Sequence, residues 1–302
     1  MSELPDVASL AAAPMDRILR LWEGLGYYRR ARHLHEAAAH ILAHHRGRFP
    51  KQFEDILALP GVGRYTAGAI SSIAFDQPSP VLDGNVIRVL ARFCGIAGDP
   101  RRSATNQTLW GISAALVSAA HAMGEHCGAL NQSLMELGAT TCTARNAACS
   151  LCPVRRACVA RRENRVESLP ALPKRARPTQ VREVAFVLQR QGRVLMRRRP
   201  KAGINAGLWE FPTSPLPHGA TATAAARAQF GAQAHITPLM VVRHSITTRR
   251  ISLIGVRVEA PRGLSAAPLL RGGRWCGPEV LAALPLARAH RRLAQGLSAT
   301  RS

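Results

Sequence analysis

The sequence predicts a protein of two domains, an all-helical domain over residues 1–160 and a small α+β domain over residues 183–302. One reason is the spacing of apolar residues, which follows a helical period in the first part and alternates or forms short runs in the second. Another is the polar, basic and proline-containing stretch at 161–182, whose composition is typical of a linker. A chain of 302 residues is long enough to bury two cores.

Helices are expected in the first part wherever apolar residues recur three or four positions apart. The first pattern consists of Met15, Ile18, Leu19 and Trp22, and the second of Leu34, Ala37, Ala38, Ile41 and Leu42. Further helices are expected at residues 53–57, 66–75, 86–93 and 105–121.

Strands are expected in the second part, because its apolar residues form short runs or alternate with polar ones. These segments are 184–188, 194–196, 239–242 and 251–258. Helical patterns cover residues 222–230 and 278–297. Strands that are interleaved with two helices predict a small α+β domain.

The charge of the chain indicates its kind of partner. The net charge is +23 and the isoelectric point is near 11.5. Such an excess of arginine and lysine favours nucleic acid, although a genome rich in arginine codons is a competing explanation. A hydrophobic content of 47% excludes general disorder, and no run of 18 or more strongly apolar residues predicts a membrane span. The expected location is the cytoplasm, in association with the nucleoid.

Four of the seven cysteines lie close together, in the spacing C-x6-C-x2-C-x5-C. They are Cys142, Cys149, Cys152 and Cys158. Disulfides need an oxidising compartment, and the acids and proline at residues 3–6 do not resemble a signal peptide. Zinc usually takes pairs of C-x2-C ligands, of which this stretch has one. The unequal spacing favours a [4Fe–4S] cluster in a loop over residues 142–158, ahead of zinc or unligated thiols.

A glycine-rich turn joins two of the predicted helices at residues 59–66 (LPGVGRYT). Gly61 and Gly63 permit a tight turn, and the backbone N–H groups of Val62, Gly63 and Arg64 stand at the start of the next helix. Such groups bind phosphate without reading base sequence. The pattern is that of a DNA-binding helix–hairpin–helix, and the alternative is an ordinary turn between helices.

Asp83 precedes another predicted helix in the segment 81–86 (VLDGNV). An aspartate at this position is most often the cap of the helix. The alternative is a carboxylate that remains ionised in a polar cleft, beside a developing positive charge.

The order of these motifs resembles that of the helix–hairpin–helix DNA glycosylases, and specifically the MutY-type adenine DNA glycosylases. The resemblance covers nearly the whole chain. It rests on the hairpin, on the cysteine spacing and on residues 21–28 (LWEGLGYY), 82–86 (LDGNV) and 131–138 (NQSLMELG). It implies a helical domain with a [4Fe–4S] cluster.

The resemblance also implies a mechanism. Adenine mispaired with 8-oxoguanine is flipped out of the stack, and cleavage of its N-glycosidic bond leaves an oxocarbenium-like sugar. By similarity, Asp83 is the carboxylate that stabilises this cation, Asn85 helps to arrange the site, and Tyr65 lies close to the reacting nucleotide. Tyr27 matches the wedge residue that inserts beside the oxidised base. The alternatives are a core aromatic for Tyr27 and a surface aromatic for Tyr65.

The sequence departs from the family at the proton donor. In the family this is a glutamate on a helix that precedes the matched segment, and Glu3, Glu23 and Glu36 do not fall at its position. The expectation is that the recorded start is too late, and the alternative is a shortened protein that lacks the acid. Ile87 stands where some relatives carry a lysine, so no lyase step through a Schiff base is expected.

Residues 207–212 (GLWEFP) and 284–293 resemble the Nudix-like recognition domain of the family. A hydrolytic Nudix enzyme needs a helix with glutamates that hold Mg²⁺, and residues 222–229 contain no acid. The resemblance therefore implies recognition of 8-oxoguanine and no pyrophosphatase activity. Ser245 and Thr247 are the candidates for hydrogen bonds to that base, and the alternative is a polar β-turn.

The leading hypothesis is a monomeric adenine DNA glycosylase of base excision repair that binds double-stranded DNA with A:8-oxoG or A:G mispairs. One alternative is a lesion-binding protein with impaired catalysis. The other is an endonuclease III-like glycosylase, which would use a lysine near the hairpin, where this chain has Arg64 and Tyr65.

Overall fold

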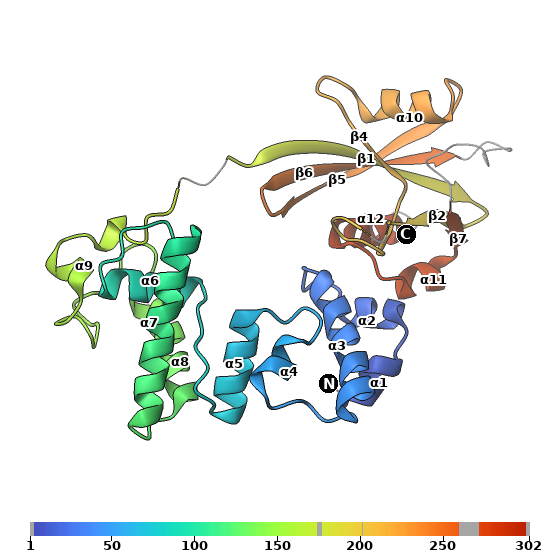
Figure 1. Ribbon diagram of the computed structural model, residues 1–302. Helices are drawn as coiled ribbons and strands as arrows, with labels where there is room; N and C mark the ends of the chain where they lie inside the picture. The colour runs from blue at the N-terminus through green and yellow to red at the C-terminus, as the bar shows by residue number, and fades with distance from the viewer. Residues whose placement is uncertain (1–2, 174–176, 201, 260–271, 300–302) are drawn as a thin grey trace. The chain divides into compact units, whose positions relative to one another are not determined.

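The computed structural model describes residues 3–173, 177–200, 202–259 and 272–299 (Figure 1). Its packing divides the chain into two compact units. The sheet unit consists of Met1–Glu36 together with Ala176–Ser302, and the helical unit of Ala37–Arg175. The first residues of the chain thus pack with its C-terminal part, and α3 (Arg29–His45) runs from one unit into the other.

The helical unit is built from short helices around an apolar core. They are α4 (Phe53–Leu57), α5 (Arg64–Phe75), α6 (Gly84–Phe93), α7 (Ser103–Ala122), α8 (Cys127–Glu136) and α9 (Val159–Arg162). A π-helix at Leu137–Thr141 extends α8, and a 3₁₀ turn lies at Val166–Ser168. Val86 and Leu90 of α6 are buried against Leu109 of α7, as the helical period predicts. This core fixes the start of α6, where Asp83 stands.

The sheet unit begins with α1 (Val7–Ala12), α2 (Met15–Leu21) and the first part of α3. Its strands are β1 (Thr179–Arg190), β2 (Arg193–Arg198), β3 (Trp209–Glu210), β4 (Thr213–Pro215), β5 (Ile236–Ile246), β6 (Arg249–Glu259) and β7 (Gly273–Cys276). Its remaining helices are α10 (Ala222–Phe230), α11 (Pro278–Ala283) and α12 (Arg288–Ala299). The predicted all-helical and α+β parts are therefore confirmed.

The strands form one mixed sheet in the order β3-β2-β1-β6-β5, with β4 on β1 and β7 on β2. The central pair β1 and β6 is parallel and the other pairs are antiparallel. Figure 1 shows α10 on one face and α11 and α12 on the other. Val184 and Phe186 of β1 pack with α10, whereas Ala185 and Val187 pack with α12. This explains the unbroken apolar run, because a strand covered on both faces has no polar side.

One predicted helix needs correction, some helices were not predicted, and one boundary differs. The helix expected over residues 278–297 is two helices, because Pro285 interrupts it. Leu284 ends α11 with an extended backbone (ψ 140°), the conformation that the residue before proline prefers. The helices α1 and α8 were not predicted, since their apolar residues are too few or too close together to show a period. Strand β1 also begins at Thr179, inside the range predicted as linker.

The helices α1 to α3 share a core with the sheet part of their unit. Leu19, Tyr28 and Ala31 pack together with Leu208 and Ala287. The segment 21–28, which carries Tyr27, is therefore built onto the unit that holds Ser245. Within the described ranges, no helix is both long and apolar enough to cross a membrane.

Candidate active site and cysteine loop

Asp83 caps α6 in the helical unit. Its Oδ1 accepts the backbone N–H groups of Asn85 at 2.9 Å and Val86 at 2.8 Å, and its Oδ2 accepts the side-chain amide of Asn85 at 3.2 Å. The predicted cap is thus present. The residue is half-buried beside the fully buried Val81 and Val86, so the carboxylate keeps access to solvent. Oδ2 has one hydrogen-bond partner among the described residues, so it can still face a positive group.

Arg88 connects this cap to the cysteine loop. Its Nη2 donates to Asn85 Oδ1 at 2.7 Å and to the Gly138 carbonyl at 2.5 Å, and its Nε donates to the Cys142 carbonyl at 2.7 Å. Gly138 permits the close packing of its backbone against Asn85, because an added Cβ would lie 2.7 Å from the Cβ of Asn85. The side chain of Asn85 is therefore fixed from both sides, by Asp83 and by Arg88.

Tyr65 stands near Asp83 at the start of α5. Partial burial and then the charge of Asp83 raise the pKa of the Tyr65 phenol, so the two side chains influence each other. The hydroxyl donates to Met135 Sδ at 3.6 Å, and 38% of the side chain is exposed. The structure thus brings Tyr65, Asp83 and Asn85 into one region of the helical unit.

The hairpin (residues 59–66) forms the predicted tight turn. Gly61 has φ +78°, and the Val62 N–H donates to the Leu59 carbonyl at 3.0 Å. Gly63 is the N-cap of α5 and contributes no side-chain cap, so the first N–H groups of the helix are free for another acceptor. Arg64 stacks over the Trp110 ring at 4.0 Å from its centroid. The exposed turn and its fixed arginine suit a phosphate contact.

The four clustered cysteines line one cavity of the helical unit. All four are half-buried, and Arg92, Arg155 and Arg161 line the same cavity. Arg92 is 2% exposed, and it donates to the carbonyls of Thr143 at 2.7 Å and Leu169 at 2.9 Å and to Cys142 Sγ at 3.4 Å. Burial, followed by the neighbouring thiols, raises the pKa of Cys149.

The donor set of this cavity consists of four thiols, which fit a [4Fe–4S] cluster. A buried arginine beside Cys142 suits an anionic sulfur. In the part of the chain that the structure describes, no group of three or more His, Cys, Asp or Glu side chains is gathered closely enough to hold one metal ion.

A second candidate site lies in the sheet unit, in a cavity of about 500 Å³. Its polar lining includes Arg243, His244, Ser245, Arg249, Arg288 and Arg292. Gly24, Gly26 and Tyr28 line it as well. Burial lowers the pKa of His244, and its buried Nδ1 has no hydrogen-bond partner among the described residues.

Only one of the two predicted base contacts lies in this lining. Ser245 is near the end of β5, paired with Arg250 of β6. Thr247 lies in the two-residue turn between β5 and β6 with φ +51°, and its hydroxyl donates to the Ile246 carbonyl at 2.7 Å. Tyr27 is 74% exposed at the tip of the segment 21–28, so the core alternative does not hold for it.

The most buried acid of the sheet unit among the described residues, Glu210, is engaged in ion pairs. Glu210 is 1% exposed and pairs with Arg197 at 2.8 Å and with Arg199. Burial, followed by the charge of Arg199, lowers the pKa of the adjacent His290 to about 3. Helix α10, where a Nudix hydrolase would place its metal-binding glutamates, contains no acid. This arrangement offers no carboxylate for Mg²⁺ in that helix.

Sequence reasoning missed Arg88 and Arg92, which the structure places between the cap and the cysteines. A signal was present, since two arginines four residues apart interrupt an otherwise apolar helix immediately after Asp83. Their targets are backbone carbonyls distant in the sequence, so no pattern of side chains could reveal them.

Comparison with known proteins agrees with this organisation. Residues 1–114 match the HhH-GPD superfamily of base excision DNA repair proteins, and residues 184–296 match the NUDIX domain. The chain is 41% identical to the adenine DNA glycosylase of Arabidopsis thaliana over 227 residues, which is 70% of this chain and 35% of that protein. It is 33% identical to that of Rattus norvegicus over 330 aligned positions, which is 91% of this chain and 62% of that protein.

The chain spans about a third to two thirds of the length of these curated relatives. Among solved structures, a thermostable thymine-DNA glycosylase is 27% identical with a TM-score of 0.48, over 54% of this chain and 72% of that chain. The resemblance drawn from the sequence motifs is confirmed by the family matches. The part of the chain over residues 1–114 therefore belongs to the HhH-GPD superfamily of base excision DNA repair proteins, residues 184–296 belong to the NUDIX domain family, and the chain as a whole is similar to adenine DNA glycosylases.

Proposed function

We propose that this chain acts as an adenine DNA glycosylase, which hydrolyses the N-glycosidic bond of adenine mispaired with 8-oxoguanine or guanine. The observation that carries the proposal is the Asp83 cap. Its carboxylate is half-buried beside Tyr65, and its Oδ2 has room for a further electrostatic contact. The kinship with adenine DNA glycosylases supports the choice of base. Among the described residues Asp83 forms no ion pair, and such a carboxylate is suited to a cation that forms only during the reaction.

In this mechanism Asp83 stabilises the oxocarbenium-like sugar as adenine departs. Two backbone N–H bonds hold Oδ1 in place, so the carboxylate needs no reorganisation when the positive charge develops. Asn85 fixes Oδ2 and is itself fixed by Arg88. Tyr65, whose hydroxyl is directed to Met135, contacts the flipped nucleotide from the start of α5.

The hairpin residues Gly61, Val62, Gly63 and Arg64 would bind the DNA backbone, with N–H groups at the start of α5 facing a phosphate. Ser245 and the unpaired Nδ1 of His244 would bind the 8-oxoguanine base in the cavity of the sheet unit. Tyr27 would enter the stack from its exposed position. A basic lining around a polar base pocket suits a lesion within DNA.

Cys142, Cys149, Cys152 and Cys158 would hold a [4Fe–4S] cluster. The cluster would cross-link the loop 142–158 and keep its arginines on one surface. Arg92 would donate to the Cys142 sulfur, while Arg88 holds the Cys142 carbonyl. The expected role is structural, because these contacts position main chain.

The test is the replacement Asp83→Asn. Asparagine retains an oxygen that accepts the two capping N–H bonds, so the fold is kept while the negative charge is lost. Single-turnover adenine release from an A:8-oxoG duplex should fall by about 10²–10³-fold. A matched control is Asp76→Asn, because Asp76 also accepts a backbone N–H, from Gly128 at 3.0 Å, but lies outside the site.

Undiminished release by the Asp83→Asn protein would contradict the mechanism. Tight binding of the A:8-oxoG duplex without any adenine release by the unmodified protein would favour the lesion-binding alternative. Release of an oxidised pyrimidine in place of adenine would favour the endonuclease III-like alternative.

A further inference from the structure

The segment that carries Tyr27 has an unusual backbone. Gly24 has φ +92°, Gly26 has φ +68°, and Tyr27 itself has φ +47°, which is rare for a residue with a large side chain. Residues in such conformations persist only where their surroundings hold them. Trp22 Nε1 donates to the Gly26 carbonyl at 3.0 Å, which closes the loop on one side. The exposed Tyr27 ring is thus displayed by a loop that depends on its anchors.

Glu23 is the anchor at the start of this loop, and its partner is Arg291 on α12. Arg291 Nε lies 2.7 Å from Glu23 Oε1, and Nη2 lies 3.0 Å from Oε2, which is a bidentate pair. The two side chains are only 12% and 15% exposed. Burial acts to raise the pKa of Glu23, but Arg291, and then Arg20, lower it, so the carboxylate is ionised at neutral pH.

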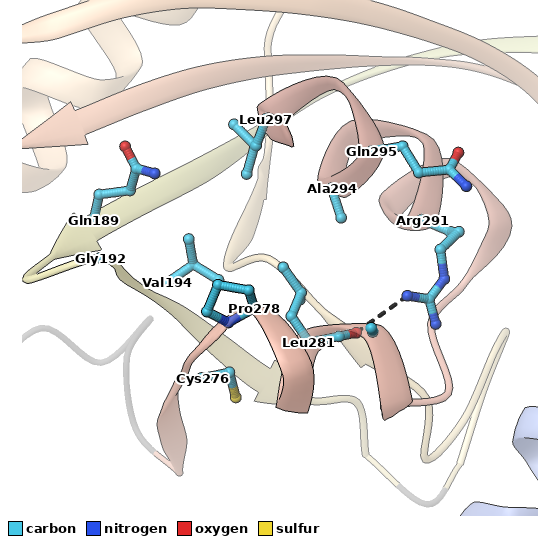
Figure 2. A pocket seen from close by; sticks show the side chains of 11 residues that line it. Gln189, Gly192, Val194, Cys276, Pro278, Leu281, Arg291, Ala294, Gln295 and Leu297 are labelled. Atoms are coloured by element: carbon cyan, nitrogen blue, oxygen red, sulfur yellow. Dashed lines mark hydrogen bonds between the residues drawn. The ribbon is translucent and has the colours of Figure 1, made fainter. Parts of the chain in front are cut away.

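Arg291 is itself fixed to helices α11 and α12 of the sheet unit. Its Nη1 donates to the Leu281 carbonyl at 3.1 Å, and its Nη2 donates to the Leu284 carbonyl at 2.6 Å. Figure 2 shows the first of these bonds at the edge of an apolar pocket between α11 and α12. The position of Glu23 is therefore determined by α11 and α12, far away in the sequence.

The loop that carries Tyr27 and the C-terminal part of the sheet unit line one cavity. Gly24, Gly26 and Tyr28 of the loop line it together with Ser245 and Arg292. Gly24 follows Glu23 and Arg292 follows Arg291, so each residue of the ion pair is next in sequence to a residue that lines this cavity. A shift of Glu23 would change the shape of the cavity and the position of Tyr27 together.

We propose that Glu23 and Arg291 are a positioning pair. The pair holds Tyr27 in place relative to the base pocket, so that Tyr27 and the pocket contact the same lesion. The inference rests on the proposed function, because it assigns the two groups to the same 8-oxoguanine. Glu23 does not touch the base. It acts through the loop that carries Tyr27.

The experiment measures the dissociation constants of an A:8-oxoG duplex and of an undamaged A:T duplex. Glu23→Gln keeps the shape of the side chain and removes its charge. We expect about tenfold weaker binding of the lesion duplex, which corresponds to about 1.4 kcal/mol, and no change for the undamaged one. Arg291→Met should have the same effect, and the double variant should be no weaker than either single variant.

A second arm separates positioning from general stability. In a Tyr27→Ala background, Glu23→Gln should cause no further loss of lesion binding, because the loop has no ring left to place. A structural role would lower binding in both backgrounds. The matched control is Asp16→Asn, which removes the ion pair of Asp16 with Arg198 at 2.5 Å. That pair joins the same two parts of the chain, but its side chains are 44% and 45% exposed, so it should not affect binding.

Each result has a defined meaning once thermal unfolding shows that the variants are folded. Unchanged lesion binding by both Glu23→Gln and Arg291→Met would overturn the inference, as would equal losses with and without Tyr27. If the unmodified protein does not prefer the A:8-oxoG duplex, the proposed function itself fails. The two failures are therefore distinguishable.

Discussion

Arginines that are buried or half-buried stabilise the two units of this chain in different ways. In the helical unit, Arg88 and Arg92 donate mainly to backbone carbonyls and have no acidic partner among the described residues. In the sheet unit, Arg199 and Arg291 are paired with the carboxylates of Glu210 and Glu23. The same side chain thus secures a loop in one unit and neutralises an acid in the other.

This difference fits the roles proposed for the two units, catalysis in the helical unit and recognition in the sheet unit. Arg88 donates to Asn85 and to carbonyl groups, and Asp83 forms no ion pair with any residue that the structure describes. Glu210, in contrast, is buried between arginines and has no free oxygen for a metal. An available carboxylate can stabilise a transient cation, and a neutralised one can only support a fold.

The largest effect is expected for Arg92→Met, which removes every donor that Arg92 gives to the cysteine loop. The carbonyls of Thr143 and Leu169 would be left unpaired, at a cost of about 3 kcal/mol or more in the free energy of unfolding. The purified unmodified protein should contain a cluster that absorbs at about 400 nm, and the Arg92→Met protein should lose much of this absorbance. Denaturant unfolding and iron analysis measure both.

The control for this change is Arg101→Met, whose guanidinium is 63% exposed and pairs with Asp99. It should leave stability and absorbance unchanged. A colourless unmodified protein would contradict the proposal that the four cysteines hold an iron–sulfur cluster. Full absorbance in Arg92→Met would show that the loop does not depend on its carbonyl contacts.

A smaller effect is expected for Glu210→Gln. The two arginines would face a neutral amide in a buried site, which should lower the free energy of unfolding by about 2–3 kcal/mol. Glu259→Gln is the matched control, because its carboxylate is 69% exposed beside His235. Equal stability of the two variants would contradict the view that the sheet unit uses its acids as structural counter-ions.

The smallest effect is expected at the exposed pair of His126 and Asp76, 2.7 Å apart. The hydrogen bond that His126 donates to Asp76 raises the pKa of His126 above 6.5, and the Gly128 N–H, then His126, lower the pKa of Asp76 below 3.8. The contribution of His126 is fully present below pH 6.5 and is lost as the pH rises through its folded pKa. That of Asp76 is present above pH 3.8 and is lost as the pH falls.

Thermal unfolding of His126→Gln should therefore differ most from the unmodified protein at about pH 5 and converge with it in alkaline solution. His121→Gln, on α7 of the same unit, is the control. A difference that grows with pH would reverse the assignment.

Part of the site was predictable from the sequence and part was not. The cap by Asp83, the turn at Gly61 and the grouping of four cysteines follow from contacts within a few residues, and the structure contains each of them. The role of Asp83 as a catalytic carboxylate, and the roles of Asn85 and Tyr65, stay predictions. The break at Pro285 was also present in the sequence, but the apolar period on both sides obscured it.

The sequence by itself determined the class of each domain, because the period of apolar residues reports which faces of a helix or strand are buried. It also determined the motifs that act over short distances, such as the helix cap and the hairpin. The tertiary structure decided which arginine meets which partner. The contacts of Arg291 with Glu23 and of Arg92 with Leu169 join residues 268 and 77 positions apart, and only folding brings such groups together.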